Sequence, residues 1–411
     1  MIHSIEIENY FGIRDKQKLD FRVAKNVPIL NVFRDPKSKI GGRIPTAIGI
    51  FGANASGKTT VLRALSSLVR AILHSFDLQP NQSIPLMMPF EHNDWKTRPT
   101  RFVIEFDALW DNFEEEFKLA QQEHRPAKCD LYRYEAEISH QVGKTGIAFQ
   151  SERLFVTRHA GSRTQPVFIR EHGTFTSAKG LGIKPSDDIL KRIRDNASTI
   201  STLAKFNVPF AVNAWNSISL VESNVVISRE EYNANAVFQW YGQNPSALTA
   251  LNAELQRLDF GLREMRIYQA EKGPSAIFFH DGLENPIDFF FESLGTRNFV
   301  SQFSMAQRTL TTGGISLFDE LTNSLHQSIV SEILGWFADC ERNPFNAQII
   351  FTTHDVALLN ELEKEQIIIT EKSSDGAVEM FLLKDLQGVR REPNLMPKYL
   401  SGTFGGLPRI G

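Results

Sequence analysis

Apolar and polar residues alternate in several stretches of the first 170 residues. A period of two residues is typical of a half-buried strand, because successive side chains point to opposite faces of a sheet. The stretches with this pattern are residues 2–8, 17–23, 101–106, 129–139, 153–157 and 166–170. We therefore predict a strand-rich first part, with a turn at 10–12 and irregular segments at 25–45 and 79–99.

The apolar spacing becomes helical in the middle of the chain. Apolar residues recur at helical spacing at positions 189, 190 and 193, and again at 248, 251, 255 and 258. Between residues 186 and 258 the only glycine is Gly242. This pattern predicts a helical insertion, and it does not persist over enough heptads to indicate a long coiled coil.

Beyond the predicted insertion, strands and helices alternate. Residues 260–279 have strand character, and short apolar runs follow at 315–318, 348–351 and 366–370, separated by helical segments. This alternation is typical of an α/β fold. We expect three parts: an N-terminal strand-rich lobe at 1–180, a helical insertion at 181–265 and a C-terminal lobe at 266–411.

A glycine loop joins a predicted strand to a predicted helix near residue 50. The apolar run Ala47–Phe51 precedes the loop, and helical spacing follows it up to about Phe76. The loop reads Gly52-Ala53-Asn54-Ala55-Ser56-Gly57-Lys58-Thr59, a full match to the G-x-x-x-x-G-K-[ST] phosphate-binding pattern.

The residue types at the key positions of this loop follow from the chemistry of phosphate binding. Gly52 and Gly57 allow backbone angles at which consecutive amides converge on phosphates, and the helix start favours negative charge. Lys58 is expected to reach the β- and γ-phosphates, and the Thr59 hydroxyl to bind Mg²⁺. We include the next residue, Thr60, in the nucleotide-binding set. The predicted ligands are therefore ATP and Mg²⁺.

Two later strands end in residues that suit metal and water chemistry. The run 315–320 ends in Asp319, a candidate Mg²⁺ ligand, and Glu320, a candidate to orient or deprotonate the attacking water. The run 348–353 is followed by His354, which we expect to contact the γ-phosphate. A solvated acid pair and a structural histidine are the alternatives. Beside a complete phosphate loop we favour catalytic roles for Lys58, Glu320 and His354.

Composition narrows the class of protein without changing this picture. The net charge of −3 gives no general attraction to nucleic acid, although residues 153, 158, 159, 163 and 170 form a local basic group. The two cysteines, Cys129 and Cys340, are far apart, and the chain has neither a signal-peptide pattern nor a membrane-length apolar run. We expect a cytoplasmic protein that does not enter a membrane. The aromatic run Phe289–Phe291 indicates either an aromatic-rich core or a hydrophobic partner surface, and the core is the favoured interpretation.

These motifs, in this order, resemble the ABC-type ATPase heads of the SMC, RecF and OLD group, and in particular the AAA-family ATPases of prokaryotic abortive-infection systems. Residues 52–59 resemble Walker A and residues 317–320 Walker B. The other similar segments are the N-terminal strand-turn at 9–12, a reduced signature motif at 293–296, a D-loop at 323–326, a switch histidine at 353–354 and a C-terminal tail at 398–405. No residue is assigned to the Q-loop glutamine.

The resemblance implies a fold and a mechanism. It implies an ABC-type P-loop NTPase head with a mixed central sheet, split by the insertion, that dimerises head to tail on ATP. Ser293 and Gly295 would then donate to the γ-phosphate of the partner's ATP, whereas spacing alone favours Ser293 as an ordinary helix cap. Hydrolysis would release the dimer. Oligomers larger than a dimer are an alternative that the sequence leaves undecided.

The resemblance also suggests a role in anti-phage defence. No nuclease constellation follows His354 in the sequence, so we expect a separate effector, such as a nuclease or toxin, to be sensed or regulated. The alternative is a DNA-repair or chromosome-maintenance ATPase that clamps DNA, for which the local basic group would serve; solvated strand faces are the plainer explanation of that group. A transport ATPase subunit fits the split head less well.

Overall fold

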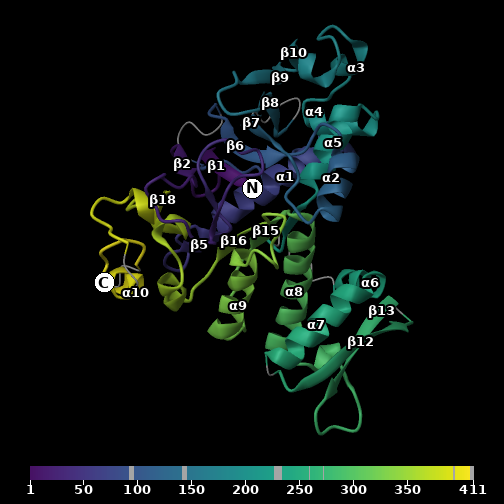
Figure 1. Ribbon diagram of the computed structural model, residues 1–411. Coiled ribbons are helices and arrows are strands. Elements are labelled where there is room, and N and C mark those ends of the chain that lie inside the picture. The colour runs from purple at the N-terminus through teal and green to yellow at the C-terminus, as the bar shows by residue number, and fades with distance from the viewer. Residues whose placement is uncertain are drawn as a thin grey trace.

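The computed structural model describes residues 1–91, 97–140, 146–225, 234–258, 260–271, 273–391 and 394–407. Its centre is a six-stranded sheet with the order β11-β15-β16-β5-β17-β18 (Figure 1). The strands are β5 (Ala47–Phe51), β11 (Val221–Ser223), β15 (Ile315–Phe318), β16 (Gln348–Thr352), β17 (Ile367–Lys372) and β18 (Val378–Leu382). The first five run parallel, and β18 is antiparallel to β17.

The apolar runs at the centre of this sheet are buried along their whole length. Every residue of β5, β15 and β16 is buried. Continuous apolar strands are expected in parallel sheets, because helices and loops cover both faces. The mixed central sheet with its helices confirms the expected α/β fold.

A second, antiparallel sheet is formed by the alternating stretches of the first part. It has seven strands in the order β10-β9-β8-β7-β6-β1-β2. Their bounds are β1 (Ile2–Glu8), β2 (Gln17–Asp20), β6 (Thr100–Ala108), β7 (Asp130–Ser139), β8 (Ala148–Thr157), β9 (Gln165–Glu171) and β10 (Thr174–Ser177). The predicted strands are confirmed, with β8 beginning five residues earlier and β2 ending three residues earlier than expected. The segment predicted as irregular before β5 holds two short paired strands, β3 (Phe33–Arg34) and β4 (Ile44–Pro45).

Helix α1 (Lys58–His74) packs into a hydrophobic core that includes residues of both sheets. Val61, Leu62 and Leu68 on this helix are almost completely buried. A 3-10 turn, η1 (Ser75–Asp77), follows the helix and completes the predicted helical stretch. The phosphate loop is therefore anchored on both sides, by a fully buried strand and by a helix fixed in the core.

The segment predicted to be helical divides into two groups of helices with a strand between them. The first group is α3 (Asp188–Lys191), α4 (Thr199–Lys205) and α5 (Pro209–Ile218), and the second is α6 (Ala234–Gln243) and α7 (Pro245–Arg257). Helices α4 and α5 lie against α1, whereas α6 and α7 lie against α8 (Leu294–Thr312). Between the groups, β11 pairs with β15, so this segment supplies an edge strand of the main sheet. The three-part division of the chain stays a prediction.

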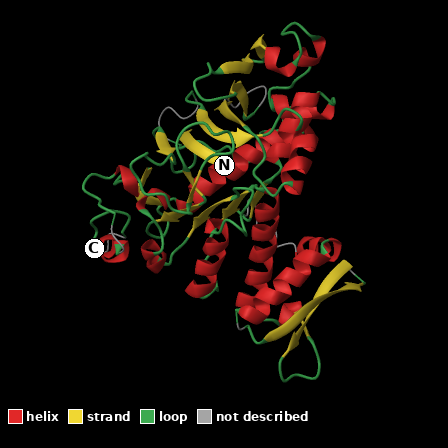
Figure 2. Cartoon of the chain, in the orientation of Figure 1, coloured by secondary structure: helices red, strands yellow, loops and turns green. Residues whose placement is uncertain are grey.

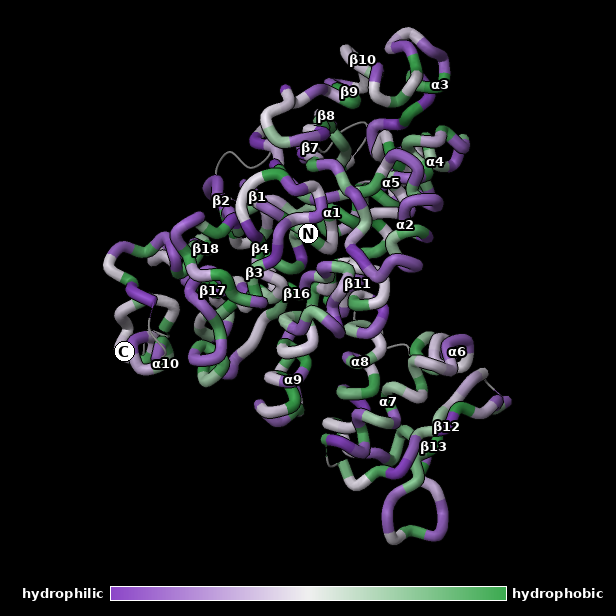
Figure 3. Tube along the Cα trace, in the orientation of Figure 1, coloured by the Kyte–Doolittle hydropathy of each residue, from purple (hydrophilic) through white to green (hydrophobic). Residues whose placement is uncertain are grey.

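An arm projects from the main body, at the lower right of Figure 2. It contains α6, α7 and the hairpin of β12 (Leu262–Ala270) and β13 (Gly273–His280), extended by β14 (Ile287–Asp288). The remaining helices are α2 (Phe113–Gln122), α9 (Gln327–Ala338) and α10 (Leu395–Leu400). Hydrophobic and hydrophilic residues alternate along α8 and α9, as on helices with one buried side (Figure 3). Among the described residues, none of the helices combines the length and apolar character of a membrane span.

The core prediction for the phenylalanine run is wrong for two of its three members. Phe289 is 3% exposed, and its ring lies 4.8 Å from that of Phe238. Phe290 and Phe291 are 62% and 85% exposed. The three residues form a 3-10 turn, η3, in which consecutive side chains point about 120° apart. Only one of them can therefore face the core.

Candidate functional site

The phosphate loop has a backbone that requires glycine at both of its key positions. Gly52 and Gly57 have φ angles of 154° and 104°. A Cβ at Gly52 would lie 2.3 Å from the carbonyl oxygen of Thr370, and one at Gly57 would lie 2.6 Å from the side chain of Val378. The two glycines are thus fixed by backbone angle and by close packing against β17 and β18.

Lys58 spans the mouth of this loop. Its Nζ donates to the carbonyl oxygens of Gly52 and Ala53, at 2.9 and 3.0 Å. Burial lowers the pKa of Lys58, and the nearby carboxylates of Glu320 and Asp319 oppose that shift. The amine therefore lies where it can exchange two carbonyl oxygens for phosphate oxygens. The hydroxyl of Ser56, which also belongs to the predicted nucleotide-binding set, is buried against that of Thr370 at 2.7 Å.

The two candidate metal ligands are neighbours, although they are 260 residues apart in the chain. Thr59 Oγ1 donates to Asp319 Oδ1 at 3.0 Å, and Thr352 Oγ1 donates to the same oxygen at 2.7 Å. A hydroxyl and a carboxylate are the oxygen donors that Mg²⁺ takes in proteins, where it keeps several waters and adds substrate phosphates. The residues present therefore fit a Mg²⁺ ion bound together with a nucleotide.

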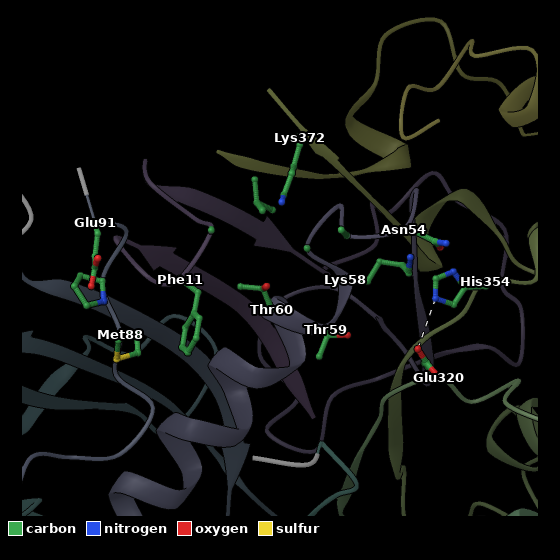
Figure 4. A pocket seen from close by; sticks show the side chains of 15 residues that line it. Phe11, Asn54, Lys58, Thr59, Thr60, Met88, Glu91, Glu320, His354 and Lys372 are labelled. Carbon is green, nitrogen blue, oxygen red and sulfur yellow. Dashed lines mark ion pairs between the residues drawn. The ribbon is translucent and has the colours of Figure 1, made fainter. Parts of the chain in front are cut away.

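Glu320 and His354 face each other across the same space (Figure 4). The His354 Nε2 lies 3.7 Å from Glu320 Oε1, and both side chains are about half exposed, at 47% and 52%. Glu320 has a positive φ of 53°, and its amide donates to Thr352 Oγ1 at 2.7 Å. A non-glycine residue held in this region by a specific hydrogen bond is typical of functional sites.

Several of these groups line one cavity of about 690 Å³. Its lining includes Asn54, Ala55, Gly57, Lys58, Thr59, Thr60, Glu320 and His354. Phe11, Met88 and Pro89 supply apolar surface, and Lys372 and Glu91 supply charge at the rim (Figure 4). The volume is in the range of small-molecule sites and suits a nucleotide.

Ser293 and Gly295 do not line this cavity and instead begin α8. Ser293 caps the helix, with its Oγ accepting from the amide of Thr296 at 3.1 Å, as helical spacing predicted. A Cβ on Gly295 would lie 2.8 Å from the carbonyl oxygen of Ser324. The start of α8 is thus packed against the turn that follows Glu320, and within one chain it is separate from the phosphate loop.

Sequence reasoning missed Asn224, which holds the backbone of Asp319. Asn224 Oδ1 accepts from the amide of Asp319 at 2.6 Å, and its Nδ2 donates to the carbonyl oxygen of Asp319 at 3.2 Å. The residue directly follows β11, in the segment predicted to be helical. Val221–Ser223 covers only three residues, of which one is apolar, so it carries no strand pattern of its own. Thr352 was also missed, because a hydroxyl inside a strand has no local signature.

Three of the five residues of the local basic group are paired or buried in the structure. Arg170 is 1% exposed, and its guanidinium donates to carbonyl oxygens of residues 193, 194 and 197. Arg153 donates to Glu171, and Arg158 donates to Asp111 and Asp130. Paired and buried arginines contribute little to the binding of phosphate backbones, so these three give little support to a DNA-binding face, whereas Arg163 and His159 of the same group are exposed.

Comparison with known proteins gives a family match and a set of similar folds. The solved structures include an SMC head bound to the C-winged helix domain of ScpA, at 13% identity, with 92% of this chain and 97% of that chain covered and a TM-score of 0.43. The SMC head domain from Thermotoga maritima is 11% identical, with 93% of this chain and 98% of that chain covered and a TM-score of 0.40. The Smc head domain with an extended coiled coil, bound to the C-terminal domain of ScpA derived from Pyrococcus furiosus, is 12% identical, with 92% of this chain and 95% of that chain covered and a TM-score of 0.44.

No curated protein is similar enough in sequence to count as a relative. The family model described as "AAA domain, putative AbiEii toxin, Type IV TA system" matches residues 48–360, which is well over half of the chain and includes the phosphate loop, the acid pair and His354. The chain therefore belongs to this family of AAA domains.

Proposed function

We propose that this protein is a cytoplasmic, ATP-dependent molecular switch that hydrolyses ATP, dimerises when ATP is bound and controls a separate effector in anti-phage defence. The observation that carries the proposal is the convergence of Lys58, Thr59, Glu320 and His354 on one cavity, with Asp319 hydrogen-bonded to Thr59 beside it. They come from the carboxyl ends of three neighbouring parallel strands, where ligands bind in open α/β sheets.

In the proposed mechanism, the amides of the phosphate loop and the start of α1 bind the phosphates, and Lys58 neutralises charge on the β- and γ-phosphates. Thr59 and Asp319 would hold Mg²⁺, which supplies further neutralisation of phosphate charge. Glu320 orients the attacking water and accepts its proton. His354 lines the same cavity, 3.7 Å from Glu320, and in the proposal it contacts the γ-phosphate and keeps that carboxylate in place.

A second copy would complete each site. Ser293 and Gly295 lie outside the cavity of their own chain, so they can donate to a phosphate only in another copy. A head-to-tail pair related by a two-fold axis contains two identical composite sites. ATP then joins the two copies, and loss of the γ-phosphate separates them.

The family description supports the defence role. It names a putative toxin and a type IV toxin–antitoxin system. In the proposal, the ATP-bound dimer is the state that holds or releases an effector such as a nuclease or toxin.

The test uses the full chain with Glu320→Gln. This variant should bind ATP with Mg²⁺, fail to hydrolyse it and elute as a dimer in size-exclusion chromatography with light scattering. Lys58→Ala is the matched control: it should bind ATP roughly tenfold or more weakly by calorimetry and stay monomeric. A Glu320→Gln chain that stays monomeric at saturating ATP would refute the dimer switch.

The same variant tests the partner. Trapped in the ATP state, Glu320→Gln should retain an effector in a pull-down that Lys58→Ala does not retain. ATP-dependent, salt-sensitive binding of duplex DNA by Glu320→Gln, with no protein partner retained, would instead favour a DNA-clamping ATPase.

A further inference from the structure

Lys372, the last residue of β17, is a second lysine on the wall of the nucleotide cavity (Figure 4). Its side chain is exposed, and within the described ranges its amine forms neither an ion pair nor a hydrogen bond. Lys384, which follows β18, differs: its amine donates to the carbonyl oxygens of Asp20 and Arg22. Surface lysines are mostly solvated, so the position of Lys372 decides whether it has a further role.

The pairing of β17 with β18 determines where this side chain points. Lys372 is directly opposite Val378 in the antiparallel pair, and opposite residues point to the same face of a sheet, with their Cβ atoms about 5 Å apart. Val378 is 2% exposed, and its methyl carbons lie 2.6 Å from the position that a Cβ on Gly57 would occupy. Lys372 therefore lies on the face of the hairpin that packs against the phosphate loop, within reach of a phosphate bound there.

The same hairpin is fixed by the turn that follows β1. The amide of Val378 donates to the carbonyl oxygen of Gly12 at 2.7 Å, and a Cβ on Gly12 would lie 2.8 Å from the Val378 side chain. Arg14 forms an ion pair with Asp375 in the tip between the two strands. A side chain on a fixed backbone loses less conformational freedom on binding than one on a loose loop. Lys372 thus starts from a fixed position beside the phosphate loop.

The other groups of the cavity indicate which phosphate is nearest to Lys372. The Glu320 carboxylate lies on one side of Lys58, and Lys372 lies on the other (Figure 4). In phosphate loops of this pattern the lysine reaches the β- and γ-phosphates, whereas backbone amides hold the α- and β-phosphates. With the γ-phosphate toward Glu320, the phosphate on the Lys372 side is the α-phosphate.

We propose that Lys372 contacts the α-phosphate of the bound nucleotide and is a second binding cation of this site, distinct in its role from Lys58. The α-phosphate keeps its bonds when the γ-phosphate leaves, so this contact is the same before, during and after hydrolysis. An interaction that is equally strong in the ground state and the transition state increases affinity without accelerating the chemical step. Lys372 therefore holds ATP and ADP alike. This proposal rests on the nucleotide binding proposed above.

The test is calorimetry of the full chain with ATP and with ADP, each in the presence of Mg²⁺. Lys372→Ala should weaken the binding of both nucleotides by roughly tenfold, because a charge-assisted contact with phosphate is lost. In the hydrolysis assay KM should rise by a similar factor, and kcat should change by less than about twofold. Lys372→Arg keeps the cation and should recover most of the affinity. Weaker binding of ATP with unchanged binding of ADP would place the contact at the γ-phosphate and overturn the assignment.

Controls separate the outcomes. Lys191→Ala removes the same charge from a 66% exposed lysine of α3, outside the cavity, and should bind both nucleotides as wild type does. Thermal unfolding without nucleotide checks that Lys372→Ala is folded, and Lys372→Gln replaces it if it is not. Wild-type affinity of the Lys372 variant for both nucleotides overturns the role of Lys372 and leaves the proposed function standing. A wild-type chain that binds neither nucleotide refutes both proposals.

Discussion

Removal of the Asn224 side chain tests how Asp319 is held in place at the end of β15. Asn224 makes two hydrogen bonds to the backbone of Asp319, at 2.6 and 3.2 Å, from a position just beyond the edge strand β11. Asp319 in turn accepts hydrogen bonds from Thr59 and Thr352. In Asn224→Ala the amide and carbonyl of Asp319 lose these partners, and the carboxylate is free to move away from Thr59.

The expected magnitudes follow from those contacts. Each hydrogen bond contributes about 1 kcal/mol to stability, so the free energy of unfolding should fall by about 2 kcal/mol. A residue that orients a metal ligand without binding the metal typically affects metal affinity or activity by roughly 10- to 100-fold. We expect a loss of that size in the apparent Mg²⁺ affinity during ATP hydrolysis, with a smaller change in the affinity for ATP itself.

The assay is the rate of phosphate release at saturating ATP while Mg²⁺ is varied, combined with urea unfolding. Ser223→Ala is a matched control, since the Ser223 hydroxyl contacts Ser66 and the amide of Val225 and does not touch Asp319. It should keep the wild-type Mg²⁺ dependence. If Asn224→Ala loses stability but keeps its Mg²⁺ dependence and maximal rate within twofold of wild type, Asn224 is only a structural residue and the reasoning fails.

Two further predictions concern residues outside the nucleotide cavity. Burial lowers the pKa of His140 to about 4 from 6.5, so the unfolded chain takes up a proton at a higher pH than the folded one, and stability is lost as pH falls from about 6.5 toward 4. Between pH 7.5 and 5, wild type should lose about 2 kcal/mol of unfolding free energy that His140→Gln does not lose in urea titrations; equal losses would contradict this. Phe291→Ser should change stability by less than about 0.5 kcal/mol, because the side chain is 85% exposed. In the Glu320→Gln background it should weaken the ATP-dependent dimer by roughly tenfold or more in sedimentation, and an unchanged dimer would show that this face is not covered.

The sequence predicted those parts of the fold in which a local pattern of residues determines the backbone conformation. The glycine loop is one: Gly52 and Gly57 need positive φ, and the strand and helix on either side are visible as an apolar run and a helical repeat. The strands of the antiparallel sheet are another, since alternation follows directly from one buried face. In both cases the information lies within about ten consecutive residues.

The parts that the sequence did not predict depend on a partner far away in the chain. Strand β11 is short, and what makes it a strand is its pairing with β15, almost a hundred residues later. Arg170 looks like a DNA-contacting residue until Glu152 is seen opposite it on the neighbouring strand. The phenylalanine run is apolar as a whole, but the turn that contains it exposes two of its three rings.

One short turn connects Glu320 with the start of α8. Glu320 begins it, with a positive φ and its amide bound by Thr352. The turn continues to Asn323, whose carbonyl oxygen accepts from Asn298 of α8 at 3.0 Å, and to Ser324, whose carbonyl oxygen leaves no room for a side chain at residue 295.

A movement of Glu320 during hydrolysis would therefore be transmitted through packed backbone to the start of α8. That end of α8 carries Ser293 and Gly295, so in the proposed dimer a chain that hydrolyses its own ATP would also change its hold on the ATP of the other copy. Packed interfaces have discrete arrangements and deform little, so such a shift favours release over gradual loosening. In the proposed dimer, the turn between Glu320 and the start of α8 would therefore couple the two sites.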